Sequence, residues 1–190
     1  MIEVGTAIRR CGVFAASALL LVLAACAHAP ARSAIELPPL QLAPSALGHA
    51  VSAQQRLHFT FGKHERDMDA LLEADTDEVR LLVQAMGQVG VRLFWDGREL
   101  KQQRAPWLPP QVRAERVLDD LQFVLWPAQA IHDVLPPQWT LRETGGVREL
   151  LRDGHVWLSA SEMADGRMRL DNRVDGYQLE IESIASEASP

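Results

Sequence analysis

The chain has 190 residues, 47% of them hydrophobic, and a formal net charge of −6 at pH 7. Basic and acidic residues are interspersed along it, and an acidic surface without basic clusters argues against nucleic acid as a partner. The two cysteines do not provide the disulfide framework of a small secreted domain, so stability must come from an apolar core.

Residues 1–25 have the three parts of a secretory signal: a basic start at Arg9 and Arg10, an apolar run, and small residues at the end. The apolar run of about 13 residues is shorter than the roughly 20 residues that a membrane-spanning helix needs. We therefore expect a cleaved signal peptide over residues 1–25, whose removal also removes Cys11.

The signal ends in Leu23-Ala24-Ala25-Cys26, which resembles the lipobox of bacterial lipoproteins. The resemblance implies that Cys26 becomes the new N-terminus and carries a thioether-linked diacylglycerol, usually with a further acyl chain. Two or more acyl chains hold a protein stably on a membrane. Because Ala27 and not aspartate follows, the resemblance implies sorting to the outer membrane, on its periplasmic face. An ordinary signal peptide with a chance cysteine is the alternative.

Residues 26–52 are rich in alanine and proline and show almost no periodicity, which is typical of a flexible tether. Four leucines suggest that its distal part packs on the domain: Leu37, Leu40, Leu42 and Leu47. We expect the folded domain over residues 53–186.

Alternating apolar and polar residues predict β-strands on both sides of a central helical stretch. The first group of strands is expected at residues 56–61, 67–74, 79–83, 89–95 and 98–103. The second group is expected at residues 139–143, 147–151, 155–161, 167–172 and 177–184. Turn sequences such as Asp96-Gly97 and Gly145-Gly146 separate them.

The central stretch, residues 115–126, predicts an amphipathic helix. Its apolar face is Val117, Leu118, Leu121, Val124 and Leu125. Its opposite face is Glu115, Arg116, Asp119, Asp120 and Gln122. A second short helix is expected at residues 128–135. The pattern predicts a mainly β fold: a strongly curved antiparallel half-barrel of about ten strands with a short helical insertion.

Two segments carry a family resemblance: residues 79–88, followed by a strand into Asp96-Gly97, and residues 118–136 with their Leu-Pro ending. Over residues 55–184 the chain resembles the LolA/LolB carriers, and more closely LolB, the lipid-anchored receptor that sorts lipoproteins to the outer membrane. The resemblance implies acyl chains as cargo, a periplasmic carrier protein as partner, and an apolar loop tip at Met86 that enters the membrane.

The chain also resembles uncharacterised lipoproteins encoded beside aryl-polyene biosynthesis genes. That resemblance implies a polyene lipid or another hydrophobic molecule as an alternative cargo.

A curved sheet that helices only partly fill leaves an apolar concave face, where lipophilic ligands bind. The expected lining is Leu57, Phe59, Phe61, Leu81, Val83, Val91, Leu93, Trp95, Trp157, Leu179 and Ile181. An ordinary filled core is the alternative for these residues.

No residues are spaced as a metal site, a Gly-x-Ser-x-Gly nucleophile elbow or a phosphate-binding loop requires. We therefore expect no cofactor, no metal and no enzymatic activity. The sequence predicts a monomeric, outer-membrane-anchored lipoprotein that binds or transfers a hydrophobic cargo. A structural or interaction lipoprotein of an envelope or biosynthetic complex is the alternative, and an enzyme acting on lipid intermediates is a third candidate.

Overall fold

The computed structural model describes residues 35–108 and 112–184, so the predicted signal peptide, the lipobox and Cys26 lie outside the described residues. Residues from Glu36 onward form one compact unit. In the described ranges, no helix has both the length and the apolar character to cross a bilayer.

The fold is mainly β, as the sequence predicts, with ten antiparallel strands in one unclosed sheet. The first five strands are β1 (Val51–Phe61), β2 (His64–Ala74), β3 (Val79–Ala85), β4 (Gln88–Trp95) and β5 (Leu100–Arg104). The last five are β6 (Trp139–Thr144), β7 (Val147–Arg152), β8 (His155–Glu162), β9 (Met168–Asn172) and β10 (Tyr177–Ile184). Every predicted strand is present, and most extend a few residues beyond the predicted ends.

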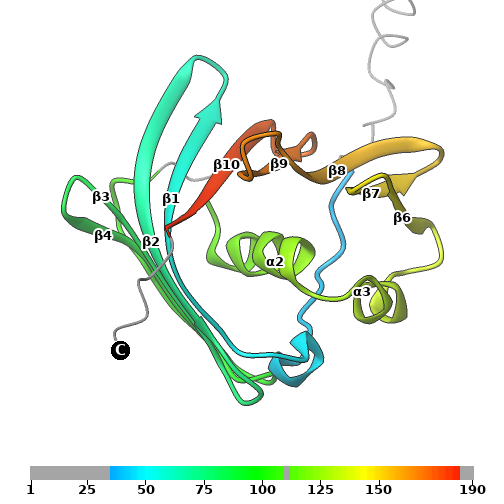
Figure 1. Ribbon diagram of the computed structural model, residues 1–190, viewed down its shortest axis with the longest axis horizontal. Helices are drawn as coiled ribbons and strands as arrows, with labels where there is room; N and C mark the ends of the chain where they lie inside the picture. The colour runs from blue at the N-terminus through cyan, green and yellow to red at the C-terminus, as the bar shows by residue number, and fades with distance from the viewer. Residues whose placement is uncertain (1–34, 109–111, 185–190) are drawn as a thin grey trace, which may run out of the picture. The chain divides into compact units, whose positions relative to one another are not determined.

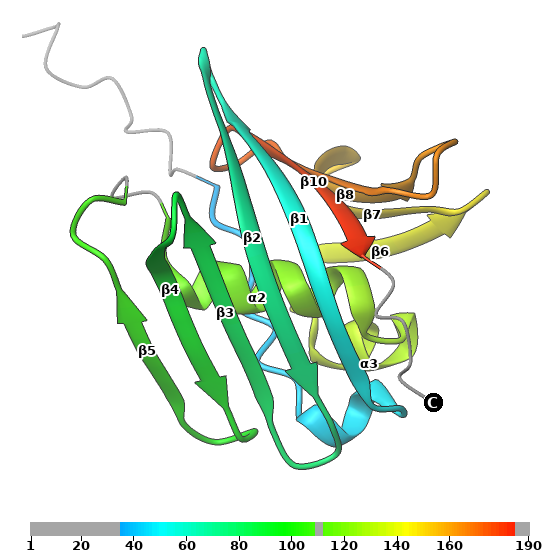
Figure 2. The same ribbon diagram turned by 60° about the vertical axis from the view of Figure 1, so that its left-hand side comes forward.

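The strand order is β5-β4-β3-β2-β1-β10-β9-β8-β7-β6, so β5 and β6 are the two edges. The two halves of the chain join through antiparallel pairing of β1 with β10, in which Leu57 lies opposite Ile181 and Phe59 opposite Leu179. Bulges in the β3–β4 and β7–β8 pairs add local twist. The sheet curves around the helices (Figure 1), and the strands of its first half lie side by side in front of the longer helix (Figure 2).

Two helices connect the edge strands across the concave side: α2 (Ala114–Leu125) and α3 (Ala128–Val134). Helix α2 ends before Pro127, which lacks an N–H and precedes the first turn of α3. Contacts link α2 to β4 and β5, and α3 to β6. The helices therefore fill part of the concavity that the sheet encloses.

The distal part of the segment predicted as a tether, residues 26–52, packs on this core, as its leucines predict. Its four leucines are all buried: Leu37, Leu40, Leu42 and Leu47. A short 3-10 helix, η1 (Pro44–Leu47), leads toward β1, whose start at Val51 also lies within the predicted tether. From Glu36 onward the chain is therefore part of the domain.

Extended backbone inside a core needs hydrogen-bond partners because buried N–H and C=O groups are costly when unpaired. The polar face of α2 supplies them. Leu42 N–H donates to Gln122 Oε1 at 2.9 Å, and Gln122 Nε2 donates back to Leu42 O at 2.9 Å. Leu40 N–H donates to Asp119 Oδ1 at 2.8 Å, and Arg116 Nη2 donates to Leu37 O at 3.2 Å.

The indole N–H groups of two tryptophans also donate hydrogen bonds to the backbone of this segment. Trp95 Nε1 donates to Leu42 O at 2.7 Å, and Trp126 Nε1 donates to Ala43 O at 3.1 Å. Both rings are buried.

The sequence pattern does not predict this arrangement, because the polar face of an amphipathic helix normally meets water. Here Arg116, Asp119, Asp120 and Gln122 are all buried. Apolar residues of the opposite face, such as Leu121 and Val124, are only partly buried. The N-terminal segment covers the polar face and leaves the apolar face toward an open space.

Changing Gln122 to alanine removes the amide that pairs with both backbone groups of Leu42. Because Leu42 N–H is then buried without a partner, we expect the free energy of unfolding to fall by about 2–3 kcal/mol in urea denaturation of the full chain. Gln129→Ala is the matched control, since Gln129 bonds only to the exposed Asp133, and it should change stability by less than about 0.5 kcal/mol. Equal losses in the two variants would contradict the role of Gln122.

Candidate ligand-binding cavity

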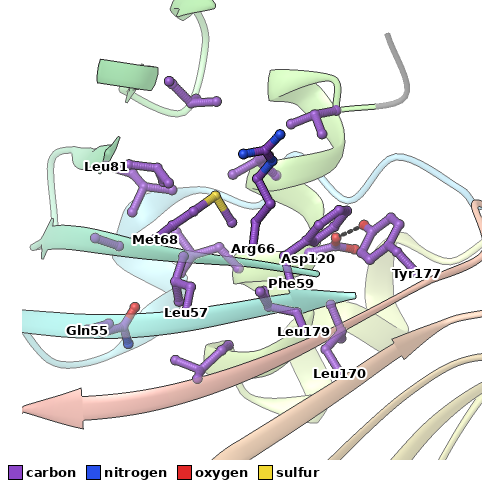
Figure 3. Close-up of a pocket in the computed structure, with 18 of the residues that line it drawn as sticks. Gln55, Leu57, Phe59, Arg66, Met68, Leu81, Asp120, Leu170, Tyr177 and Leu179 are labelled. Atoms are coloured by element: carbon purple, nitrogen blue, oxygen red, sulfur yellow. Dashed lines mark hydrogen bonds between the residues drawn. The ribbon is translucent and has the colours of Figure 1, made fainter. Parts of the chain in front are cut away.

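A cavity of about 490 Å³ lies between α2 and the concave face of the sheet, and it is open to solvent (Figure 3). Its walls come from β1, β2, β3, β4, β9, β10, α2 and the segment that follows β5. This volume is within the range of roughly 300–1,000 Å³ that small-molecule sites occupy in proteins. The concave side of the sheet is therefore not a filled core throughout.

Eight of the predicted lining residues lie on the cavity wall. They are Leu57, Phe59, Phe61, Leu81, Val83, Val91, Leu179 and Ile181. Residues two apart in a strand share a face of the sheet, and the β1–β10 register brings the apolar residues of both strands together. Alternation and strand order thus account for this part of the wall.

Three predicted lining residues do not line this cavity. Trp95 points to the concave side, but its indole is buried against Leu42. Leu93, also on β4, is only 1% exposed and belongs to the packed core. Trp157 has the opposite orientation in β8, because its neighbour Leu158 is the buried residue and adjacent strand residues face opposite sides.

Sequence reasoning missed most of the wall. The apolar face of α2 contributes Val117, Leu121, Val124 and Leu125. Strand β2 adds Met68 and Ala70, and β9 adds Met168 and Leu170. The alternation in β2 could have identified Met68, whereas the helical residues have the pattern of ordinary core residues until their neighbours are known.

Trp107 forms part of the cavity rim and is 40% exposed. Its ring lies directly on β4, where a Cβ at Gly90 would come within 3.2 Å of the Trp107 ring. Any other residue at position 90 would push the ring away. Gly90 therefore allows an aromatic side chain to close this side of the wall.

A buried polar cluster interrupts the apolar wall between α2 and β10. The Tyr177 hydroxyl accepts a hydrogen bond from Asn172 Nδ2 at 3.1 Å and donates its own proton to Asp120 Oδ2 (Figure 3). Arg116 lies near two further carboxylates, at 3.5 Å from Asp119 and 3.7 Å from Asp175. Asp120 Oδ1 is buried and has no hydrogen-bond partner among the described residues.

Burial raises the pKa of Asp120 from its usual value near 3.8 to about 7, although the Tyr177 hydroxyl and Arg116 favour the charged carboxylate. Burial also raises the pKa of Asp119. For Tyr177, burial and then the nearby Asp120 raise the pKa well above its ordinary value. The cluster therefore changes its charge near neutral pH through Asp120.

Met86, the predicted membrane-insertion residue, forms the β3–β4 turn together with Gly87. It is 84% exposed and has a positive φ of 51°, followed by a φ of 73° at Gly87. A non-glycine residue in this left-handed region costs roughly 1–2 kcal/mol. The turn therefore presents an apolar side chain to solvent from a backbone position that glycine would occupy more easily.

Comparison with protein families matches residues 52–185 to a family described as "Protein of unknown function (DUF3261)". The match covers most of the chain and almost all of the sheet. The chain belongs to this family. No curated protein matches the chain. Among the described residues, no three His, Cys, Asp or Glu side chains are grouped as metal ligands would be.

The titration of Asp120 predicts how stability depends on pH. Because the pKa of Asp120 is higher in the folded state than in the unfolded chain, the folded state binds more protons between pH 4 and 7. Stability therefore falls as pH rises through this window. From pH 5 to pH 8 we expect a loss of about 3 kcal/mol from this group, measured by urea denaturation of the full chain.

Asp120→Asn is the test variant, since an amide oxygen still accepts the Tyr177 hydroxyl and does not titrate. We expect its stability to change much less over the same pH range. Asp119 titrates in the same direction in both proteins, so only the difference between the two pH profiles reports on Asp120. Parallel profiles would show that Asp120 is not the titrating group.

Proposed function

We propose that this protein is a lipid-anchored lipoprotein on the periplasmic face of the outer membrane, which binds or transfers a hydrophobic cargo in its cavity. The observation that carries the proposal is the open apolar cavity of about 490 Å³. The lipobox resemblance at Cys26 supports the anchor, and the LolB resemblance supports a cargo such as a lipid, a polyene lipid or the acyl chains of a lipoprotein. A periplasmic carrier protein would deliver it.

Apolar side chains on an open cavity wall favour a binding role on energetic grounds. Each buried methylene of a ligand contributes roughly 0.8 kcal/mol. Residues such as Leu121, Val124 and Leu179 are only partly buried in the structure. An apolar chain in the cavity would bury both its own surface and theirs. Apolar contacts of this kind suffice for binding or transfer, so we propose no enzymatic activity.

Met86 extends the proposal to the membrane surface. An exposed apolar side chain at the tip of a rigid hairpin is suited to insertion among lipid headgroups. We propose that this turn contacts the bilayer when cargo is released.

The first test measures binding of an uncharged apolar dye, 1-N-phenylnaphthylamine, by fluorescence. The full chain carrying Cys26→Ser, made by cell-free synthesis without membranes, avoids any attached lipid. We expect saturable binding with one dye per chain. Leu121→Trp places a large ring from α2 into the cavity and should weaken binding at least tenfold.

Leu71→Trp is the matched control, because Leu71 is 40% exposed in β2 and does not line the cavity. It should bind the dye as tightly as the parent chain does. Absence of saturable binding to the parent chain would overturn the cargo-binding proposal and favour a lipoprotein that acts through its surface.

The second test concerns the anchor. When the full chain is expressed in a bacterial host with labelled palmitate, we expect the label on the protein and the protein in the membrane fraction. Cys26→Ser should abolish the labelling. Cys11→Ser is the matched control and should leave it unchanged, because residue 11 lies in the proposed signal peptide. Labelling that survives Cys26→Ser would refute the assigned site.

A further inference from the structure

Strand β2 separates its charges between the two faces of the sheet. Its acidic residues Glu65, Asp67, Asp69 and Glu73 alternate with His64, Arg66, Met68, Ala70 and Leu72. The acidic residues face outward: Asp67 bonds His58 at 2.7 Å, and Glu73 pairs with Arg80 at 4.0 Å. The other set contributes His64, Arg66, Met68 and Ala70 to the cavity wall.

The side chains on the inward face of β2 therefore change from polar or charged to apolar along the strand. At the β1–β2 turn this face begins with His64 and Arg66, which are exposed. It continues with the partly buried Met68 and ends with the buried Leu72 and Ala74. A molecule lying along this face would meet His64 and the cationic Arg66 first and apolar groups deeper in the cavity.

The cavity is basic, although the chain is acidic. Its wall contains three arginines, Arg66, Arg113 and Arg116, and one carboxylate, Asp120. The whole chain has a net charge of −6. The cavity wall therefore has an excess of positive charge, whereas the chain as a whole has an excess of negative charge.

The three arginines differ in how far their charge is already balanced. Arg116 is buried beside Asp119 and Asp175. Arg113 lies 4.0 Å from the exposed Glu36, a weak surface pair. The guanidinium of Arg66 makes no hydrogen bond or ion pair with any described residue, and Arg66 lies opposite Phe59 in the β1–β2 register, on the cavity side (Figure 3).

We propose that the cavity binds an amphiphile with an anionic headgroup, a carboxylate or a phosphate, that pairs with Arg66 while the apolar chain occupies the cavity. The inference rests on the proposed function and names the class of cargo. A guanidinium offers a planar fork of N–H donors that fits both carboxylate and phosphate oxygens. Arg113 adds positive charge near the same headgroup, and His64 adds a polar ring at the β1–β2 turn.

The alternative role for Arg66 is structural: its aliphatic stem covers Phe59 and Phe61 while its charge stays in water. The two roles give different binding data. A structural role would affect all ligands alike, whereas headgroup pairing affects only anionic ligands.

The experiment measures displacement of 1-N-phenylnaphthylamine from the full chain carrying Cys26→Ser. The competitors share one tail and are used below their micelle-forming concentrations: dodecanoate, dodecyl phosphate, dodecan-1-ol and dodecyltrimethylammonium. We expect both anions to bind at least tenfold more tightly than the alcohol, and the cation to bind more weakly than the alcohol. Raising the salt concentration should reduce the preference for the anions.

Arg66→Gln should remove most of this preference and leave the affinity for dodecan-1-ol unchanged. Arg92→Gln is the matched control: Arg92 is an exposed arginine of β4 that does not line the cavity, and its removal should leave the preference intact. Circular dichroism and thermal unfolding check that both variants are folded.

The outcomes separate the inference from the function on which it rests. Equal affinity for anions and alcohol, or a preference that survives Arg66→Gln, would overturn the headgroup site and leave the cavity function standing. Displacement by none of the four competitors would overturn the cavity function itself. A preference for dodecyl phosphate over dodecanoate would support a phospholipid-type headgroup, and the reverse would support a free carboxylate.

Discussion

The paired hydrogen bonds between Gln122 and Leu42 fix the orientation of helix α2 on the concave side of the sheet. Residues 36–43 cross the core without helix or strand partners, so their backbone groups depend on side chains. Gln122, Asp119 and Arg116 bind three successive points of that segment, at Leu42, Leu40 and Leu37. Because burying these polar groups unpaired would cost several kcal/mol, the helix and the segment must be ordered together.

The orientation of α2 that these hydrogen bonds impose explains why a cavity remains between the helix and the sheet. With Arg116, Asp119 and Gln122 held against the N-terminal segment, α2 turns Asp120 and its apolar face toward β1, β2 and β10. Val117, Leu121 and Val124 therefore face Leu57, Phe59 and Leu179 across a space that neither side fills. A helix with its polar face in water would instead press its apolar residues into the sheet. The burial of polar side chains and the openness of the apolar wall are thus two results of one arrangement.

Charged and apolar side chains lie at different places along the cavity wall. The β1–β2 hairpin carries its acidic residues outside and His64 and Arg66 inside. Among the described residues of the wall, the only carboxylate is Asp120, which is paired with Tyr177 and has a raised pKa. An apolar tail and an anionic head would find their complements at different places on the wall. The proposed carrier function and the proposed headgroup class therefore depend on separate groups and can fail separately.

The sequence by itself determined the ten strands, the two helices and part of the sheet side of the wall, because alternation and 3.6-residue periodicity are local properties of the chain. It also contains the lipobox-like sequence Leu23-Ala24-Ala25-Cys26, on which the proposed anchor at Cys26 rests. The leucines at 37, 40, 42 and 47 also predicted that the distal tether packs on the domain. Only the tertiary structure decided that this segment lies on the polar face of α2, that α2 buries that face, and that Leu93 and Trp95 are packed while Leu121 faces an open space. Those outcomes depend on hydrogen bonds between residues about 80 positions apart, such as Leu42 and Gln122. A local sequence pattern does not indicate which distant segment will cover a given face of a helix.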